Sequence, residues 1–231
     1  MTLALQDRVY VVTGGFGALG QALAGALGEQ GARVALLDRA QVRLGSQDTE
    51  RTLHLGGVDL GVPGAAQGAL AHVVQRWQRI DGLINVAGGF AWETLAEGSL
   101  ETWDRQYAMN LRSAVAASQA VLPHLGRGGR IVNIGAMAAL KAGAGTGAYA
   151  ASKAGVLRFT EALADELKDR GVTVNAVLPS IIDTAANRRD MPGAEFDRWV
   201  TPQALSRVVA FLLSDDAAAI TGACLPVAGR V

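Results

Sequence analysis

The chain has 231 residues, of which 50% are hydrophobic and 18% are charged, so it can bury the core of one domain. Its 21 basic and 21 acidic residues balance to a formal net charge of +0, which argues against binding to nucleic acid or to an anionic membrane surface. The single cysteine excludes an intramolecular disulfide, and the three histidines are scattered, so we expect no metal site.

No apolar run approaches the roughly 20 residues that a membrane-spanning helix needs, so we expect no membrane contact. The first ten residues include the acidic Asp7 and lack the pattern of a signal peptide. We therefore expect a cytoplasmic protein.

Short apolar runs and helical patterns alternate along the chain, which predicts an α/β fold with a doubly wound parallel sheet. We expect strands at 9–12, 32–38, within 53–60, and at 83–89, 130–134, 172–178 and 220–227. Helices are expected at 18–30, 63–77, 100–122, 148–170 and 202–214. Residues 180–200 have no clean period and are interpreted as an excursion over a site. No linker or repeat interrupts the chain, so residues 1–231 are expected to form a single domain.

The first strand runs into a glycine-rich loop, Gly15-x-Gly17-x-x-Gly20, which the first predicted helix follows. This spacing is typical of a dinucleotide-binding loop. Its glycines permit a tight turn and let a pyrophosphate approach the free N–H groups of the helix. Taken alone, the motif also fits a plain strand-to-helix turn.

An acidic residue ends the second predicted strand, because Asp38 follows Gly20 by 18 residues. At this spacing a carboxylate accepts hydrogen bonds from the adenosine ribose of a dinucleotide and repels a 2′-phosphate, which favours NAD(H) over NADP(H). Arg39 follows immediately and keeps NADP(H) open. A solvated acid at a strand end is the alternative.

Tyr149 and Lys153 lie four residues apart on a predicted helix and so share one face. A phenol titrates near about 10, and a neighbouring cation stabilises the phenolate, so we expect Lys153 to lower the pKa of Tyr149 toward the working range. Lysine can also bind ribose hydroxyls. The spacing alone also suits two surface residues.

Together these features resemble the short-chain dehydrogenase/reductase family over essentially the whole chain. The residues that carry the resemblance are Thr13–Gly20, Asp38, Asp59-Leu60, Asn85-Val86-Ala87-Gly88, Asn110, Tyr149-x-x-x-Lys153, Pro179-Ser180 and Thr184. The resemblance implies a Rossmann-type sheet of about seven strands with helices on both faces, and hydride transfer with a nicotinamide cofactor.

Residue roles follow from the same resemblance. It implies that Tyr149, Lys153 and Asn110 are catalytic, with Asn110 holding a water that links Lys153 to solvent. Asp59 would hold the adenine ring beside Leu60, and Asn85 would lie near the adenosine ribose. Ile182, through its backbone, and Thr184 would contact the nicotinamide amide or the phosphates. The cofactor set implied is Gly14, Gly15, Phe16, Gly17, Ala18, Leu19, Asp38, Arg39, Asp59, Leu60, Asn85, Ala87, Gly88, Tyr149, Lys153, Pro179, Ile182 and Thr184.

The most informative departure from the family pattern is Ala136, which stands thirteen residues before Tyr149, where the family carries its catalytic serine. No hydroxyl is available there to polarise a substrate carbonyl, and Thr146 is a conceivable substitute. The chain also has Ala18, Val86 and Ser180 where the family pattern has glycine, asparagine and glycine.

A narrower resemblance to the dihydropteridine reductase branch accounts for this alanine, because that branch also carries alanine there. It implies hydride transfer to a conjugated ring such as a quinonoid dihydropterin. Such a ring spreads the incoming charge, so one proton donor is enough. The substrate residues expected on this interpretation are Phe90, Ala136, Met137 and Trp199, with Trp92 adding to a flat apolar slot.

Two other functions stay open, a carbonyl or 3-oxoacyl reductase and a protein that binds NAD(H) without turnover. The substrate is expected to be a small molecule. The family resemblance also implies a homodimer or homotetramer, because the helices at 100–122 and 148–170 carry many alanines and pair across a two-fold axis in the family.

Overall fold

The computed structural model describes residues 4–42 and 44–231. Seven parallel strands form one sheet in the order β3-β2-β1-β4-β5-β6-β7. The strands are β1 Val9–Thr13, β2 Arg33–Leu37, β3 Thr52–Leu55, β4 Gly82–Asn85, β5 Arg130–Ile134, β6 Thr173–Pro179 and β7 Cys224–Val227. The predicted doubly wound sheet is confirmed.

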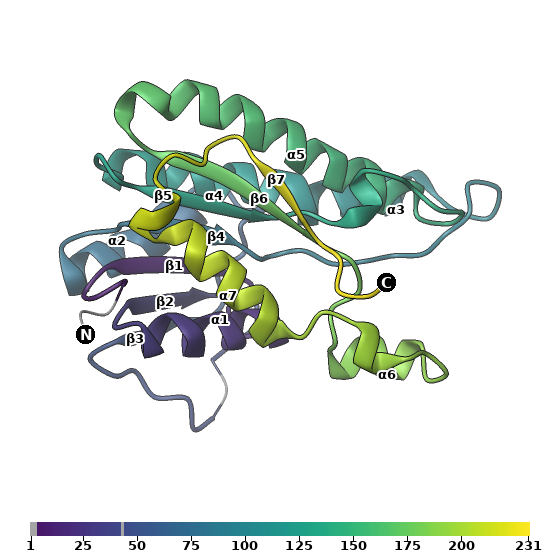
Figure 1. The fold of residues 1–231 in the computed structure, drawn as a ribbon, viewed down its shortest axis with the longest axis horizontal. Helices are drawn as coiled ribbons and strands as arrows, with labels where there is room; N and C mark the ends of the chain where they lie inside the picture. The colour runs from purple at the N-terminus through teal and green to yellow at the C-terminus, as the bar shows by residue number, and fades with distance from the viewer. Residues whose placement is uncertain (1–3, 43) are drawn as a thin grey trace.

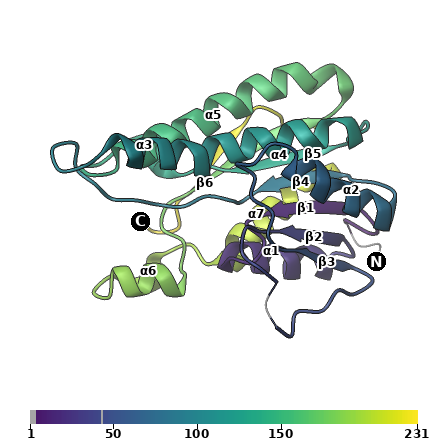
Figure 2. The same cartoon turned by 180° about the vertical axis from the view of Figure 1, so that it is seen from behind.

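Helices cover both faces of the sheet (Figures 1 and 2). The helices are α1 Ala18–Glu29, α2 Ala65–Trp77, α3 Leu100–Tyr107, α4 Ser113–Val121, α5 Gly147–Leu167, α6 Ala185–Asp190 and α7 Pro202–Leu213. Helices α1 and α7 pack together on one face, whereas α2, α4 and α5 cover the other. The short helix α6 projects beyond the sheet in both views (Figures 1 and 2).

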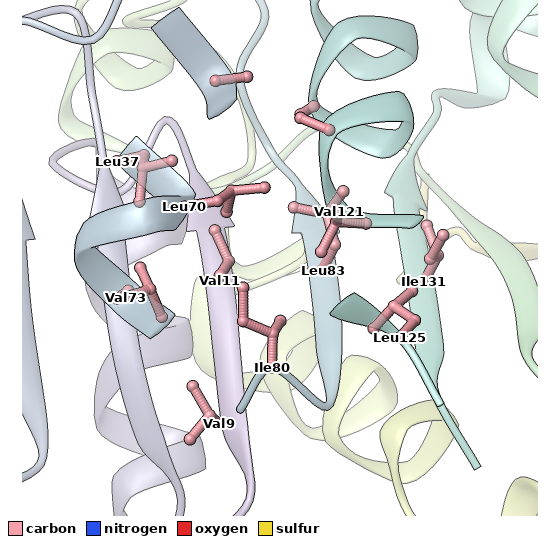
Figure 3. Close-up of a cluster of buried hydrophobic side chains, with 14 of the residues drawn as sticks. Val9, Val11, Leu37, Leu70, Val73, Ile80, Leu83, Val121, Leu125 and Ile131 are labelled. Atoms are coloured by element: carbon pink, nitrogen blue, oxygen red, sulfur yellow. The ribbon is translucent and has the colours of Figure 1, made fainter. Parts of the chain in front are cut away.

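Strand residues that alternate between the two faces build two cores. Val9 and Val11 of β1 belong to the core on the α2 and α4 side, together with Leu70, Leu83 and Val121 (Figure 3). Tyr10 and Val12 belong to the opposite core with α1 and α7. Because both faces are covered, the strands are almost continuously apolar, as expected of a parallel sheet.

The order of the strands reverses at β1, which pairs with β2 on one side and β4 on the other. The connections that follow these strands therefore leave in opposite directions at the carboxyl end of the sheet. In open α/β sheets this is where ligands bind.

Several predicted elements differ from the observed ones. The strands expected at 83–89 and 220–227 are shorter, at Gly82–Asn85 and Cys224–Val227, and α6 forms within residues 180–200. The third strand ends at Leu55 because the chain turns through Gly56 and Gly57, the latter at φ +73°, and residues 58–60 leave the sheet. The helix expected over 100–122 is divided, because a π-helical turn at Ala108–Arg112 separates α3 from α4.

Candidate active site

A cleft of about 1140 Å³ lies at the carboxyl ends of the strands. It is lined by the loop between β1 and α1, by the segments that follow β2, β4, β5 and β6, and by one face of α3 and α4. The predicted site residues that line it are Gly14, Gly17, Ala18, Leu19, Asp38, Arg39, Asp59, Leu60, Ala87, Gly88, Phe90, Tyr149, Lys153, Pro179, Ile182 and Thr184. A hollow of about 350 Å³ beside the start of β2 contains none of these residues.

The glycine loop is shaped by close packing. A Cβ on Gly15 would lie 2.7 Å from the Cβ of Leu36, and one on Gly20 would lie 2.6 Å from the carbonyl oxygen of Gly14. Helix α1 begins after Gly17 without a side-chain cap, so its first N–H groups face the cleft. Such a helix start favours an anion.

Asp38 is held at the end of β2 by the backbone around it. Its Oδ2 accepts a hydrogen bond from the N–H of Phe16 at 2.9 Å, and its Oδ1 accepts one from the N–H of Ala40 at 2.9 Å. The carboxylate thus joins the glycine loop to the second strand while it lines the cleft. The exposed Arg39 lies beside it on the same wall.

Tyr149 and Lys153 both line the cleft from α5. The Nζ of Lys153 donates to the carbonyl oxygen of Ile134 at 2.7 Å, and only 5% of this lysine is exposed. Burial lowers the pKa of Lys153 to about 8. Burial also raises the pKa of Tyr149 to about 12, so the predicted lowering of this pKa by Lys153 is absent here. Tyr149 is therefore a protonated phenol at neutral pH, which suits a proton donor.

Asn110 comes from the π-helical turn and is buried behind the cleft. Its Oδ1 accepts from the N–H of Gly89 at 2.9 Å, and its Nδ2 donates to the carbonyl oxygen of Gly89 at 3.1 Å. A Cβ on Gly88 would lie 2.6 Å from this Oδ1 and 3.5 Å from the Nζ of Lys153. The structure therefore brings Asn110 and Lys153 close to the same glycine.

Ala136 is extended, at φ −162° and ψ 152°, and is 4% exposed. It stands between Gly135 and Ala138, which line the cleft, but it does not line the cleft itself. Thr146 does not substitute for a hydroxyl here, because its Oγ1 accepts from the N–H of Gly143 at 3.0 Å and donates to the carbonyl oxygen of Gly143 at 2.8 Å.

The expected aromatic slot is formed only in part. The ring of Phe90 meets the ring of Tyr149 edge to face, with centroids 5.0 Å apart. Trp92 lies over the loop at Gly145 and donates from its Nε1 to the carbonyl oxygen of Ala144 at 3.0 Å. Trp199 is buried against Phe196, outside the cleft lining, so the structure does not place it in a substrate slot.

Other predicted residues also lie outside the lining. Asn85 points into the interior, where its Nδ2 donates to Ser118 and Asn133, and this buried pairing keeps it from the cleft. Gly15 belongs to the glycine loop but packs against Leu36. The half-buried ring of Phe16 lies near the ring of His54. The half-buried Met137 begins the short 3₁₀ helix that follows Ala136. The residues 4–42 and 44–231 contain no cluster of metal-ligating side chains and no helix able to cross a membrane.

Sequence reasoning missed part of the lining. Arg105, Ala108, Met109 and Ser113 line the cleft along one side of α3, the π-helical turn and α4. A regular helical period does not predict this face, because the π-helical turn changes the phase of the side chains. Met191, just beyond α6, also lines the cleft.

Comparison with known proteins identifies the family. The family model described as short chain dehydrogenase matches residues 8–194. The chain belongs to this family. This short-chain dehydrogenase is 35% identical over 245 residues to the 3-oxoacyl-(acyl-carrier-protein) reductase FabG of Pseudomonas aeruginosa, covering 98% of each chain. It is 33% identical over 241 residues to a D-threitol dehydrogenase of Mycolicibacterium smegmatis, covering 97% of this chain and 93% of that one.

A solved structure supports the same assignment. A blue fluorescent protein from a metagenomic library, in complex with NADPH, is 31% identical, covers 98% of each chain and superposes with a TM-score of 0.86. The protein is therefore an oxidoreductase of the short-chain dehydrogenase family, whose cofactors are NAD(P) nucleotides. These relatives do not show the dihydropteridine reductase branch and favour the carbonyl alternative.

Proposed function

We propose that this enzyme reduces a carbonyl group of a small molecule, or oxidises the corresponding alcohol, in the cleft described above. The observation that carries the proposal is that Tyr149 and the buried Lys153, four residues apart on α5, both line the cleft. The similarity to a 3-oxoacyl reductase and to a polyol dehydrogenase supports a carbonyl or alcohol substrate.

The residues present fit an NAD(P) nucleotide. The uncapped start of α1 suits the pyrophosphate, whereas Asp38 and Asp59 line the cleft as acceptors for the adenosine end. The bound cofactor supplies or accepts the hydride. Tyr149 donates the proton to the carbonyl oxygen, Lys153 supplies positive charge at the same site, and Asn110 holds the backbone of Gly89.

We propose a preference for NAD(H), because a 2′-phosphate beside Asp38 would bring two anions together. Arg39 on the same wall lowers this penalty, so NADP(H) remains usable. The dissociation constants of NADH and NADPH, measured side by side, test the preference. Tighter binding of NADPH would contradict it.

A conjugated ring such as a quinonoid dihydropterin is the second candidate substrate. Two observations favour it. Ala136 offers no hydroxyl to a carbonyl oxygen, and Phe90 with Tyr149 forms an aromatic wall in the cleft.

The deciding experiment follows oxidation of NADH and NADPH with acetoacetyl-CoA, quinones and quinonoid dihydropterin in turn. Preferred turnover of acetoacetyl-CoA supports the carbonyl proposal, and preferred turnover of the dihydropterin replaces it. No turnover of any substrate, with nucleotide binding intact, would favour the non-catalytic alternative.

We also propose a homodimer or homotetramer formed through α3, α4 and α5. Trp103, Tyr107 and Val115 are exposed on the first two helices although they are large and apolar, and small residues such as Ala151 and Ala162 are exposed on α5. Burial of this surface between subunits would stabilise it. A monomer mass by light scattering at micromolar concentration would contradict the proposal.

A further inference from the structure

Gln106 is a buried amide in α3 that the proposed chemistry does not use. It has no exposed surface, and its Oε1 accepts a hydrogen bond from the Nδ2 of Asn110 at 3.0 Å. Its own Nε2 has no hydrogen-bond partner within residues 4–42 and 44–231. An unpaired buried amide donor destabilises a fold by about 1–3 kcal/mol, so this side chain needs an explanation.

Asn110 does not need Gln106 to satisfy its hydrogen bonds. Its Nδ2 carries two hydrogens and has two further acceptors, the carbonyl oxygen of Gly89 at 3.1 Å and the Oγ of Ser152 at 3.0 Å. The hydroxyl of Ser152 donates to the carbonyl oxygen of Tyr149 at 2.7 Å, so its lone pairs are free to accept. An apolar side chain at 106 would therefore leave Asn110 fully paired and would remove the unpaired donor.

The position of Gln106 suggests what it does. It lies in the last turn of α3, and Asn110 lies four residues later, inside the π-helical turn Ala108–Arg112. Their hydrogen bond crosses the junction between the two helical forms. Side chains four apart stabilise the helical turn that joins them, and π-helical turns occur mostly at functional sites.

The π-helical turn in turn fixes the catalytic end of the cleft. Asn110 binds both backbone polar groups of Gly89, and its Oδ1 and the Nζ of Lys153 both lie close to Gly88. The next residue, Phe90, packs edge to face on Tyr149. A shift of Asn110 would therefore move the wall against which the tyrosine lies.

We propose that Gln106 is a positioning residue, which holds the π-helical turn so that Asn110 fixes the Gly88–Phe90 backbone beside Lys153 and Tyr149. This inference rests on the proposed function, because it assigns Gln106 to the same catalytic end. It predicts that Gln106 lowers the stability of the fold but raises the rate of turnover, as buried polar residues at functional sites do.

The test is Gln106→Met, which keeps the length of the side chain and removes both amide atoms. We expect kcat to fall about 10- to 100-fold, the effect of a small misplacement at a reacting centre. The dissociation constant of NADH should change less than kcat, because Gln106 itself does not line the cleft. The melting temperature should stay equal or rise, because the unpaired donor is gone.

Thr160→Val is the matched control. Thr160 is equally buried, and its Oγ1 accepts from the Nδ2 of Asn133 at 2.8 Å, but it lies outside the cleft and does not contact Asn110. This variant should lose melting temperature and keep kcat. Amide hydrogen exchange at residues 88–90 adds a readout that needs no substrate. Exchange should rise in Gln106→Met and stay unchanged in Thr160→Val.

Two results would overturn the inference. One is a Gln106→Met variant with unchanged kcat and unchanged exchange at residues 88–90. The other is a parallel loss of melting temperature, NADH affinity and kcat, which would show a purely structural role. If the unmodified protein turns over no substrate, the proposed function fails separately, and the exchange experiment still decides whether Gln106 positions this backbone.

Discussion

Substitution of Ala136 by serine tests whether the missing hydroxyl limits carbonyl reduction. The backbone accepts the change, because Ala136 is extended and precedes the short 3₁₀ helix Met137–Ala139 without a side-chain cap. Serine is a preferred residue at such a helix start. The added oxygen would stand between two residues that line the cleft, Gly135 and Ala138.

The expected gain follows from the number of donors at the substrate oxygen. Tyr149 is the one side-chain donor that we assign to that oxygen, and the loss of one oxyanion donor typically lowers kcat by about 10²–10³. Addition of a well-placed donor should therefore raise kcat/KM for acetoacetyl-CoA by up to about 10²-fold. NADH affinity should not change. Turnover of a conjugated substrate should stay level or fall as the cleft narrows.

The assay is steady-state oxidation of NADH with acetoacetyl-CoA and with quinonoid dihydropterin. Ala139→Ser is the control, because it adds a hydroxyl in the same turn at a residue that does not line the cleft. The reasoning is refuted if the unmodified enzyme already reduces acetoacetyl-CoA at about 1–10³ s⁻¹ and Ala136→Ser leaves that rate unchanged. In that case the enzyme works without the second donor.

Four further substitutions test other parts of the protein. Tyr149→Phe should lower kcat by about 10²–10⁴, the usual contribution of a general acid, and leave NADH binding intact in a titration. Asp38→Ala should narrow the ratio of NADH to NADPH affinity, and an unchanged ratio would show that this carboxylate does not select the cofactor. Gly15→Ala should lower stability by about 1–3 kcal/mol in a urea titration, because its Cβ would overlap Leu36. Gly25→Ala, with nothing within 4 Å of the added carbon, should instead stabilise α1 by up to about 1 kcal/mol.

The order of strands and helices could be predicted because each element carries a local signal. Runs such as Val9–Val12 are apolar throughout, as strands buried on both faces must be, and glycines mark their ends. The spacing from the glycine loop predicts Asp38, and the spacing of four residues on one helical face, together with the family resemblance, predicts Tyr149 and Lys153. The structure brings these three to one cleft.

Features that depend on packing between distant elements could not be predicted. The π-helical turn that carries Asn110 leaves no periodic signal in the sequence. A helix with one extra residue in a turn has the same kinds of residues as a regular helix. The resemblance to the dihydropteridine reductase branch predicts Trp199 in the substrate slot, yet this side chain is buried beside Phe196 and does not line the cleft. The sequence predicts a lowered pKa for Tyr149 from the neighbouring cation, whereas the burial that folding imposes on the phenol raises its pKa.

The buried ammonium of Lys153 makes a last prediction, on how stability depends on pH. Burial lowers the pKa of Lys153 from its ordinary value of 10.5 to about 8 in the folded protein. Between these two pH values the unfolded chain holds a proton that the folded chain has released. The free energy of unfolding therefore rises with pH in this window, by about 1.4 kcal/mol for each pKa unit. Below pH 8 both states are protonated, and the full penalty of the buried charge remains.

Lys153→Met removes this titration. The free energy of unfolding of the variant should therefore exceed that of the unmodified protein by the largest amount below pH 8. The loss of the hydrogen bond to the carbonyl oxygen of Ile134 offsets part of that advantage at every pH. The difference in unfolding free energy between the two proteins should therefore shrink as pH rises from about 8 to 10.5. Urea titrations at several pH values in this range measure the difference. Lys141→Met is the control for the loss of a lysine, because Lys141 is exposed. If the free energies of unfolding of Lys153→Met and the unmodified protein depend on pH in the same way, Lys153 does not have a lowered pKa. Its buried charge then does not destabilise the fold.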